Sequence, residues 1–229
     1  MGDVVLQQGN ASGAQFHVKD PISALTHFIA FVAAVAATPL LLVHAAVTGA
    51  ALGELVSLSV FMLSMVLLYG ASTAYHTFQL SAGGVRFLKK LDHTMIFFLI
   101  AGSYTPVCVV SLANITGFRL LVLVWGLAVL GATFKLCWIG CPKWMSSVVY
   151  IAMGWSCLTA MPQVVAALSA QGFFWLLAGG VVYTAGGVIY ALKPKNGERK
   201  AFGHHELFHL FIMGGSLCHY IFMYGYLGK

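Results

Sequence analysis

Two histidines spaced four residues apart open the last apolar segment of the chain. His205 and His209 lie in the run Gly203-His204-His205-Glu206-Leu207-Phe208-His209. On a helix this spacing places both rings on one side, one above the other. Imidazole nitrogens are common zinc ligands, and an open catalytic zinc site uses three protein ligands and keeps one position for water. The pair therefore predicts two of the three protein ligands of a zinc ion.

The same letters match H-E-x-x-H, the metalloprotease signature in which the glutamate is the general base. Such proteases take a third ligand from a downstream residue, often an acidic one, and no acidic residue follows Glu206 here. His219 lies about 15 Å beyond His209 on the same helix, too far to share an ion. The third ligand must therefore come from upstream. Glu206 stays open as a base, and we expect His27, His44 and His219 to be structural.

The upstream partner is predicted at the junction between two other apolar segments. Segment 56–78 ends with Ser72 and His76, and segment 93–112 begins directly after Asp92. If these segments cross a membrane, all three side chains lie at the depth where the last segment begins. His76 then supplies the third ligand. Asp92 could orient or deprotonate a water on the metal, and Ser72 could bond to Asp92 or to a bound carbonyl.

Simpler roles remain open for each of these side chains. A histidine in a membrane span can simply bond to a neighbouring helix, and Asp92 can pair with Lys89 or Arg86 at the interface. His93 and His204 point away from their neighbours, so we expect them at the interface. Cys137 and Cys141 resemble a metal pair, but no second cysteine pair completes it.

The composition tells which elements must position these residues. Hydrophobic residues make up 60% of the chain and charged residues 8%, and the mean hydropathy of +0.89 is typical of an integral membrane protein. Only helices can place these segments in lipid, so we expect an all-α fold, a seven-transmembrane helix bundle. Residues 1–21 form a short N-terminal segment, without a cleavable signal, and residues 22–229 the membrane domain. The seven apolar segments are 22–45, 56–78, 93–112, 119–138, 145–166, 173–192 and 205–227.

The basic residues predict the orientation of the bundle. Ten of the twelve Lys and Arg residues fall before the first segment or in alternate loops, and only Arg119 and Lys229 fall on the other side. By the positive-inside rule the N-terminus is cytoplasmic and the C-terminus extracytoplasmic. The polar junction then faces the cytoplasmic leaflet. The positive charges that give the net charge of +6 lie mainly in the loops on one side of the membrane. This distribution does not favour a nucleic-acid partner.

Three ordered motifs resemble the haemolysin III family. They are Ser72-Thr73-Ala74-Tyr75-His76, the stretch from Leu91 to Pro106, and the run from Gly203 to His209. This is the bacterial branch of the progestin and adipoQ receptors, in a superfamily that includes alkaline ceramidases. The resemblance implies seven helices, an inward N-terminus and zinc near the cytoplasmic leaflet. It implies His76, His205 and His209 as ligands, Asp92 beside the metal and Ser72 as the motif serine.

Three functions are compatible with these features. The first is a zinc-dependent hydrolase of a lipid amide or ester in the bacterial cytoplasmic (plasma) membrane; the resemblance implies a role in membrane fluidity. The second is a membrane sensor or receptor with structural zinc. The third is a cytolysin, which seven apolar segments disfavour because a secreted toxin needs a soluble form. We expect a membrane lipid as substrate or ligand, and the oligomeric state stays open.

Overall fold

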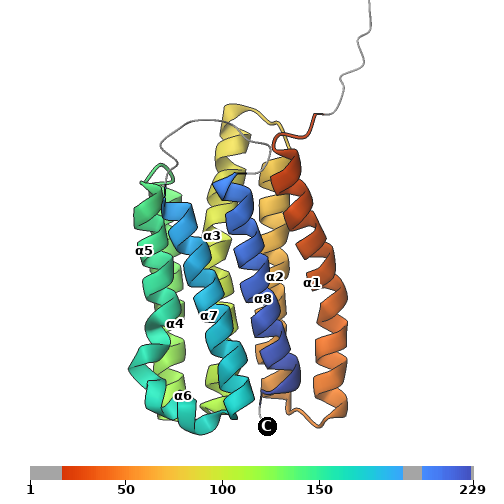
Figure 1. Cartoon of the computed structure of the whole chain (residues 1–229), viewed down its shortest axis with the longest axis vertical. Coiled ribbons are helices and arrows are strands. Elements are labelled where there is room, and N and C mark those ends of the chain that lie inside the picture. Colours follow the sequence, from red (N-terminus) through yellow and green to blue (C-terminus); the bar gives the residue numbers. More distant parts are fainter. Residues whose placement is uncertain (1–16, 193–202, 228–229) are drawn as a thin grey trace, which may run out of the picture.

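The computed structural model describes residues 17–192 and 203–227, and every regular element in these ranges is helical. Seven helical stretches are long and apolar enough to cross a membrane (Figure 1). This confirms the prediction of an all-α, seven-span bundle. The elements are α1 Pro21–Val47, α2 Leu52–Thr77, α3 Ala82–Pro106, the π-helical η1 Val107–Ser111, α4 Ile115–Cys137, α5 Lys143–Gly154, the 3₁₀-helical η2 Trp155–Ala160, α6 Met161–Ala167, α7 Ala170–Ala191 and α8 His204–Gly225.

Two spans differ from the hydropathy pattern. Helix α3 begins at Ala82, well before the predicted residue 93, and Ser81 caps it by accepting a hydrogen bond from the Gly84 amide at 3.4 Å. Its first turns carry the basic residues that the hydropathy pattern assigns to a loop. The fifth span is interrupted by the 3₁₀ stretch Trp155–Ala160. The hydropathy pattern shows only the part of a helix that lies in the lipid. The helix itself can continue beyond the lipid in turns that carry charged residues.

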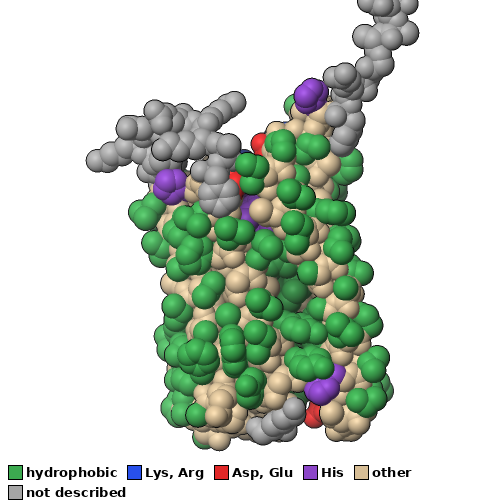
Figure 2. Space-filling view, turned by 45° about the vertical axis from the view of Figure 1, so that its right-hand side comes forward, with side chains coloured by type: hydrophobic (Ala, Val, Ile, Leu, Met, Phe, Trp, Pro, Cys, Tyr) green, Lys and Arg blue, Asp and Glu red, His purple; other side chains and the backbone are tan. Residues whose placement is uncertain are grey.

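The helices form a closed ring. Helix α1 packs on α2 and α8, α2 on α3, α3 on α4, α5 on α7, and α7 on α8. Buried side chains such as Phe61, Phe97 and Phe222 fill the space between them. Hydrophobic side chains also cover the outer face along its length (Figure 2). This is the pattern expected of a bundle surrounded by lipid.

Helices α7 and α8 approach each other closely at glycines. A Cβ atom on Gly215 would lie 2.6 Å from the Tyr183 ring, one on Gly186 would lie 2.7 Å from Phe211, and one on Gly179 would lie 2.2 Å from the His219 ring. Small residues at helix interfaces let backbones approach and pack in lipid. These glycines therefore let the two helices pack closely, and the position of the α8 side chains relative to α7 is closely fixed.

Basic residues gather at the end of the bundle where α2 and α4 finish and α3, α5 and α8 begin, which we call the histidine end (Figure 1). Among the described Lys and Arg residues, only Arg119 lies near the opposite end. Lys135 is buried, and its ammonium group donates hydrogen bonds to Ser146 Oγ at 2.6 Å and Cys141 Sγ at 3.1 Å. The predicted basic loop between the last two spans, with Lys193, Lys195, Arg199 and Lys200, lies outside the described residues, as do Lys229 and residues 1–16.

Candidate metal centre

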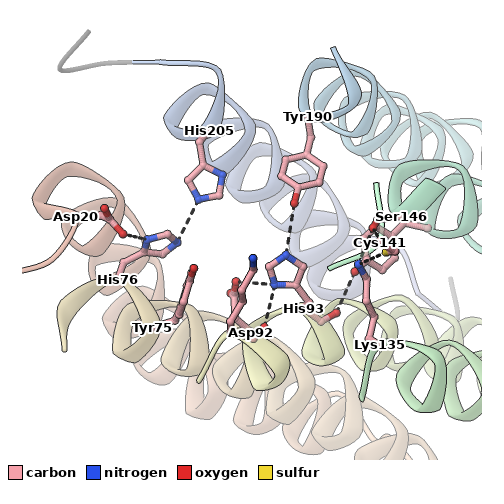
Figure 3. A network of polar contacts seen from close by, with 12 residues as sticks. Asp20, Tyr75, His76, Asp92, His93, Lys135, Cys141, Ser146, Tyr190 and His205 are labelled. Atoms are coloured by element: carbon pink, nitrogen blue, oxygen red, sulfur yellow. Dashed lines mark hydrogen bonds and ion pairs between the residues drawn. The ribbon is translucent and has the colours of Figure 1, made fainter. Parts of the chain in front are cut away.

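Three histidine rings converge at the histidine end (Figure 3 shows two of them). His76 comes from the last turn of α2, and His205 and His209 come from successive turns of α8. One nitrogen from each ring lies within 4.8 Å of the other two, and the Nε2 atoms of His76 and His205 are 3.2 Å apart. The structure therefore brings together the three predicted ligands from segments far apart in the sequence.

The distances suit a tetrahedral ion. Two nitrogens bound at 2.0–2.1 Å to a tetrahedral zinc lie about 3.3 Å from each other, close to the 3.2 Å between His76 and His205. The His209 nitrogen completes the set, in which each nitrogen lies within 4.8 Å of the other two. The cluster has three neutral nitrogen donors and no protein carboxylate among them. It leaves room for a fourth, non-protein ligand.

Asp20 holds the first of these rings. The Nδ1–H group of His76 donates to Asp20 Oδ2 at 2.9 Å (Figure 3), which leaves Nε2 free to bind a cation. The Asp20 amide also donates to the His76 carbonyl at 2.9 Å. Carboxylate partners of this kind fix the tautomer and direction of metal-binding histidines. Sequence reasoning missed Asp20, because it belongs to the short segment that was set apart from the bundle.

Lys19 extends this attachment. Its amide donates to the Thr77 carbonyl at 3.2 Å, and its ammonium group donates to the Tyr75 carbonyl and lies 3.3 Å from the centroid of the Tyr75 ring. Burial lowers the pKa of the Lys19 amine, while the Asp20 carboxylate opposes that shift. Residues 19 and 20 are thus fastened to the end of α2 by main-chain and side-chain bonds.

Thr26 holds the third ring. Its hydroxyl donates to the Ser23 carbonyl at 3.0 Å and lies 3.3 Å from His209 Nδ1. Because the hydroxyl proton is used on Ser23, Nδ1 of His209 is the donor in the second bond, and Nε2 keeps its lone pair. Helix α1 therefore positions the candidate ligand of α8, and the segment before α1 positions the candidate ligand of α2.

Asp92 and Ser72 lie beside the three rings. Both are buried, at 8% and 1% exposure, and both line the cavity described below. The Ser72 hydroxyl lies close to the Asp92 carboxylate, but the two do not meet hydrogen-bond geometry, and no other described residue bonds to this hydroxyl. Asp92 Oδ2 lies 3.4 Å from His93 Nδ1, and in the described chain it forms no ion pair with Lys89 or Arg86. A carboxylate and an unused hydroxyl thus border the candidate metal centre.

The expectation that His93 serves the interface is wrong. Its ring lines the cavity, with Nδ1 bonded to the Lys89 carbonyl at 2.9 Å and Nε2 at 3.4 Å from the Tyr190 hydroxyl (Figure 3). The ring turns inward because α7 places Tyr190 opposite it. His93 thereby connects Asp92 to α7, a contact between distant segments that spacing within one helix could not reveal.

His27 is a fourth histidine at this centre. Its ring stacks on His209 with a centroid distance of 3.6 Å, it is 3% exposed, and neither ring nitrogen has a hydrogen-bond partner in the described chain. Buried polar atoms are rarely left unpaired. Since His27 also lines the cavity, a molecule in the cavity could bond to it. From the sequence, only a structural role is expected for this histidine.

Glu206 links the start of α8 to α1 through both of its carboxylate oxygens. Its Oε2 accepts from the Gly203 amide at 2.9 Å, capping α8, and its Oε1 accepts from the Ser23 hydroxyl at 2.8 Å. Both carboxylate oxygens are therefore used to fasten the start of α8 to α1.

We expect Glu206→Ala to destabilise the bundle by about 1–2 kcal/mol, because the cap and one interhelical bond are lost. Thermal unfolding in detergent measures this loss. Glu206→Gln keeps one acceptor oxygen and should therefore lose less stability than Glu206→Ala. Equal thermal stability of Glu206→Ala and the wild type would show that neither bond contributes.

An elongated cavity of about 160 Å³ begins beside the three rings. At the histidine end its wall includes Ser72, Asp92 and His205, and it continues between α3, α5, α7 and α8 to Met161 and Phe173 near the opposite end. Most of the remaining lining is aliphatic or aromatic. The polar cluster is thus one end of a long apolar slot, a shape that suits a lipid chain.

Comparison with known proteins agrees with the motifs. A profile described as Haemolysin-III related matches residues 16–220. The chain belongs to this family. It is 37% identical over 202 residues to the Hemolysin-3 homolog of Bacillus subtilis (strain 168), covering 88% of this chain and 91% of the relative. It is 34% identical over 202 residues to Hemolysin-3 of Bacillus cereus, covering 88% and 89%. No solved structure matches the chain.

Membership of the haemolysin-III-related family confirms the resemblance that the three motifs indicated. Together with the seven apolar helices it makes this chain a multi-pass membrane protein. The matched region includes Asp20, Thr26 and His27 as well as the predicted ligands. The whole candidate centre therefore lies inside the family domain.

Proposed function

We propose that this protein is a zinc-dependent hydrolase that cleaves an amide or ester bond of a membrane lipid. The observation that carries the proposal is the junction of two features: a cluster of three histidine nitrogens within 4.8 Å, and an apolar slot that begins at Asp92 and Ser72. A site for polar bond cleavage thus adjoins a site for an acyl chain.

The residues present fit a zinc ion. His76 and His209 keep free Nε2 atoms because Asp20 and Thr26 occupy their Nδ1 groups. A bound zinc would polarise a carbonyl oxygen and lower the pKa of a water ligand to about 7. His76, His205 and His209 would hold the zinc ion. Asp20 and Thr26 would orient the rings of His76 and His209.

The neighbouring side chains have roles that follow from their positions. The Asp92 carboxylate accepts a proton from the attacking water and is held in place by His93. The Ser72 hydroxyl, which has no partner in the described chain, donates to the carbonyl of the lipid or to Asp92. The apolar wall excludes water from the bound chain and fixes the scissile bond at the polar end.

The direct test uses the purified protein in lipid nanodiscs. Metal analysis should give about one zinc per chain, and lipid amides and esters should be hydrolysed by the zinc-loaded protein. His76→Ala with His205→Ala removes two ligands, so full turnover by this double variant would rule out the proposed mechanism. His44→Ala is the matched control, since His44 stacks on Tyr224 away from the cluster, with a centroid distance of 4.1 Å.

We further infer that the histidine end faces the cytoplasm. In the described chain, the basic residues other than Arg119 lie at that end, as the positive-inside rule requires of a cytoplasmic side. The reaction would then take place in the cytoplasmic leaflet and would change the membrane's lipid composition and fluidity. Protease protection of an N-terminal tag in inverted and right-side-out vesicles tests this orientation.

A second candidate is a membrane sensor in which zinc is structural. Helices α2 and α8 are joined by side-chain hydrogen bonds such as Tyr69 to Ser216 at 2.7 Å, and an ion shared by His76 and His205 would add a second link. In that case zinc removal lowers thermal stability, and Asp92→Asn leaves the function intact. A third activity, cytolysis, is suggested by the names of the relatives from Bacillus subtilis and Bacillus cereus. Dye release from vesicles after addition of purified protein from solution would support it.

Asp20→Asn should weaken zinc binding by about 10-fold to 100-fold, because the charged partner of His76 Nδ1–H is lost while the ring remains. Competition with a zinc chelator measures the affinity. Glu54→Gln is the matched control, since the Glu54 carboxylate accepts from the Ala51 amide at 3.2 Å near the opposite end. Equal affinities of Asp20→Asn and the wild type would show that Asp20 does not support the site.

A further inference from the structure

The cavity contains a second polar position far from the candidate metal centre. His219 lies on α8, is 8% exposed and lines the same cavity as His209. Ten residues separate the two histidines, which is about 15 Å along a helix. The wall near His219 is formed by apolar side chains such as Phe173, Leu176 and Leu177. One imidazole therefore interrupts an otherwise apolar section of the slot.

The hydrogen bonds of His219 define what it can recognise. Its Nε2–H group donates to the Leu176 carbonyl at 3.3 Å, because a carbonyl oxygen can only accept. Nδ1 then carries a lone pair. This atom is buried and has no hydrogen-bond partner in the described part of the chain. Buried polar atoms are normally paired, so Nδ1 is an acceptor that lacks its donor.

The surrounding residues hold the ring rigidly and do not supply that donor. Gly179 leaves no room beside the ring, since a Cβ atom there would lie 2.2 Å away, and the Tyr183 ring meets it edge-on at 5.3 Å between centroids. Ser216 Oγ lies 2.7 Å from the Tyr69 hydroxyl and 2.8 Å from the Tyr183 hydroxyl. These hydroxyl groups are paired with one another. Nδ1 of His219 thus remains buried and unpaired among the described residues.

We propose that His219 recognises a hydroxyl group in the middle of the bound lipid's acyl chain. The polar end of the lipid lies at the three-histidine cluster, the chain follows the slot, and a chain hydroxyl about 15 Å along it donates to Nδ1. A hydroxyl fits because Nδ1 is a neutral acceptor without a donor, while the neighbouring Tyr183 and Ser216 hydroxyls are bonded to each other. The substrate class, a hydroxylated acyl lipid, rests on the proposed function; the binding preference does not require turnover.

Two ethanolamides that differ by one group provide the test: N-ricinoleoyl ethanolamine carries a mid-chain hydroxyl that N-oleoyl ethanolamine lacks. Binding to the protein in nanodiscs is measured by displacement of a fluorescent fatty acid, also in the Asp92→Asn background so that turnover does not consume the probe. We expect the hydroxylated amide to bind about 5-fold to 10-fold more tightly, the effect of one net hydrogen bond.

Variants then assign the preference to His219. His219→Phe keeps an aromatic ring and removes the acceptor, so it should abolish the preference without weakening binding of the oleoyl amide. His219→Asn, whose side-chain oxygen takes the place of Nδ1, should keep part of the preference for the hydroxylated amide. It replaces His219→Phe in the test if the phenylalanine variant is unstable. Tyr183→Phe is the control for a neighbouring hydroxyl and should keep it fully.

The outcomes separate the two proposals. Equal wild-type affinities for the two amides, or an undiminished preference in His219→Phe, would show that Nδ1 binds no more than a water molecule and would overturn the subsite. A preference that depends on His219 in a protein without turnover would uphold the subsite and reject the hydrolase. Turnover of lipid amides without any preference for the hydroxylated one would uphold the hydrolase and reject the subsite.

Discussion

Replacing His205 by alanine should reduce bound zinc from about one ion per chain to nearly none. His205 Nε2 lies 3.2 Å from His76 Nε2, so its removal leaves two rings that close only part of a coordination sphere. Loss of a residue that only supports a ligand is expected to weaken zinc affinity by about 10-fold to 100-fold. Loss of His205 should weaken it further. Zinc-dependent stabilisation should vanish too, about 4 kcal/mol at a zinc concentration 1,000-fold above Kd.

Elemental analysis and thermal unfolding with and without zinc measure these effects. Cobalt substitution provides a spectrum that reports coordination directly, independent of any enzymatic assay. His44→Ala, at the other end of the bundle, should behave as the wild type in all three measurements. If His205→Ala keeps a full equivalent of zinc and an unchanged cobalt spectrum, the three histidines are not the metal centre.

Asp92→Asn should have the second large effect, on turnover and not on metal content. The Asp92 carboxylate borders the cavity and lies outside the set of three converging nitrogens. Asparagine keeps the size of the side chain and cannot take up a proton at neutral pH. General-base catalysis contributes about 10²–10⁴-fold, so hydrolysis of a lipid amide should slow by that factor while zinc stays bound.

The measurement is kcat for a lipid amide together with zinc content of the same preparation. Glu54→Gln, a carboxylate-to-amide change remote from the cavity, is the control and should keep full activity. Loss of zinc in Asp92→Asn would assign the carboxylate to metal binding. Unchanged turnover with zinc bound would remove Asp92 from the mechanism and would favour structural zinc.

The convergence of the three histidines was predictable because each lies at the end of an apolar segment. His76, His205 and His209 follow from segment boundaries and the four-residue spacing, and alternation of the spans then places them at one depth. The seven helices follow from hydropathy for the same reason: lipid constrains length and backbone pairing so strongly that composition determines the element type.

The supporting residues were not predictable in this way. Asp20, Thr26 and Tyr190 act through contacts with distant helices, and those contacts depend on how each helix is rotated about its axis. Apolar spans that are hydrophobic on all sides give little information about rotation. Likewise, the start of α3 and the break at Trp155–Ala160 depend on hydrogen bonding that hydropathy does not record.

The attachment of residues 19 and 20 to the end of α2 bears on how the protein is handled. A boundary drawn from hydropathy at residue 21 suggests that the preceding stretch can be trimmed or replaced by a purification tag. Such a truncation would delete the carboxylate that orients His76, and under the proposed function we expect the shortened protein to bind zinc more weakly than the full chain. Expression vectors should therefore keep the natural sequence through Asp20 and place any tag upstream of it or at the opposite terminus.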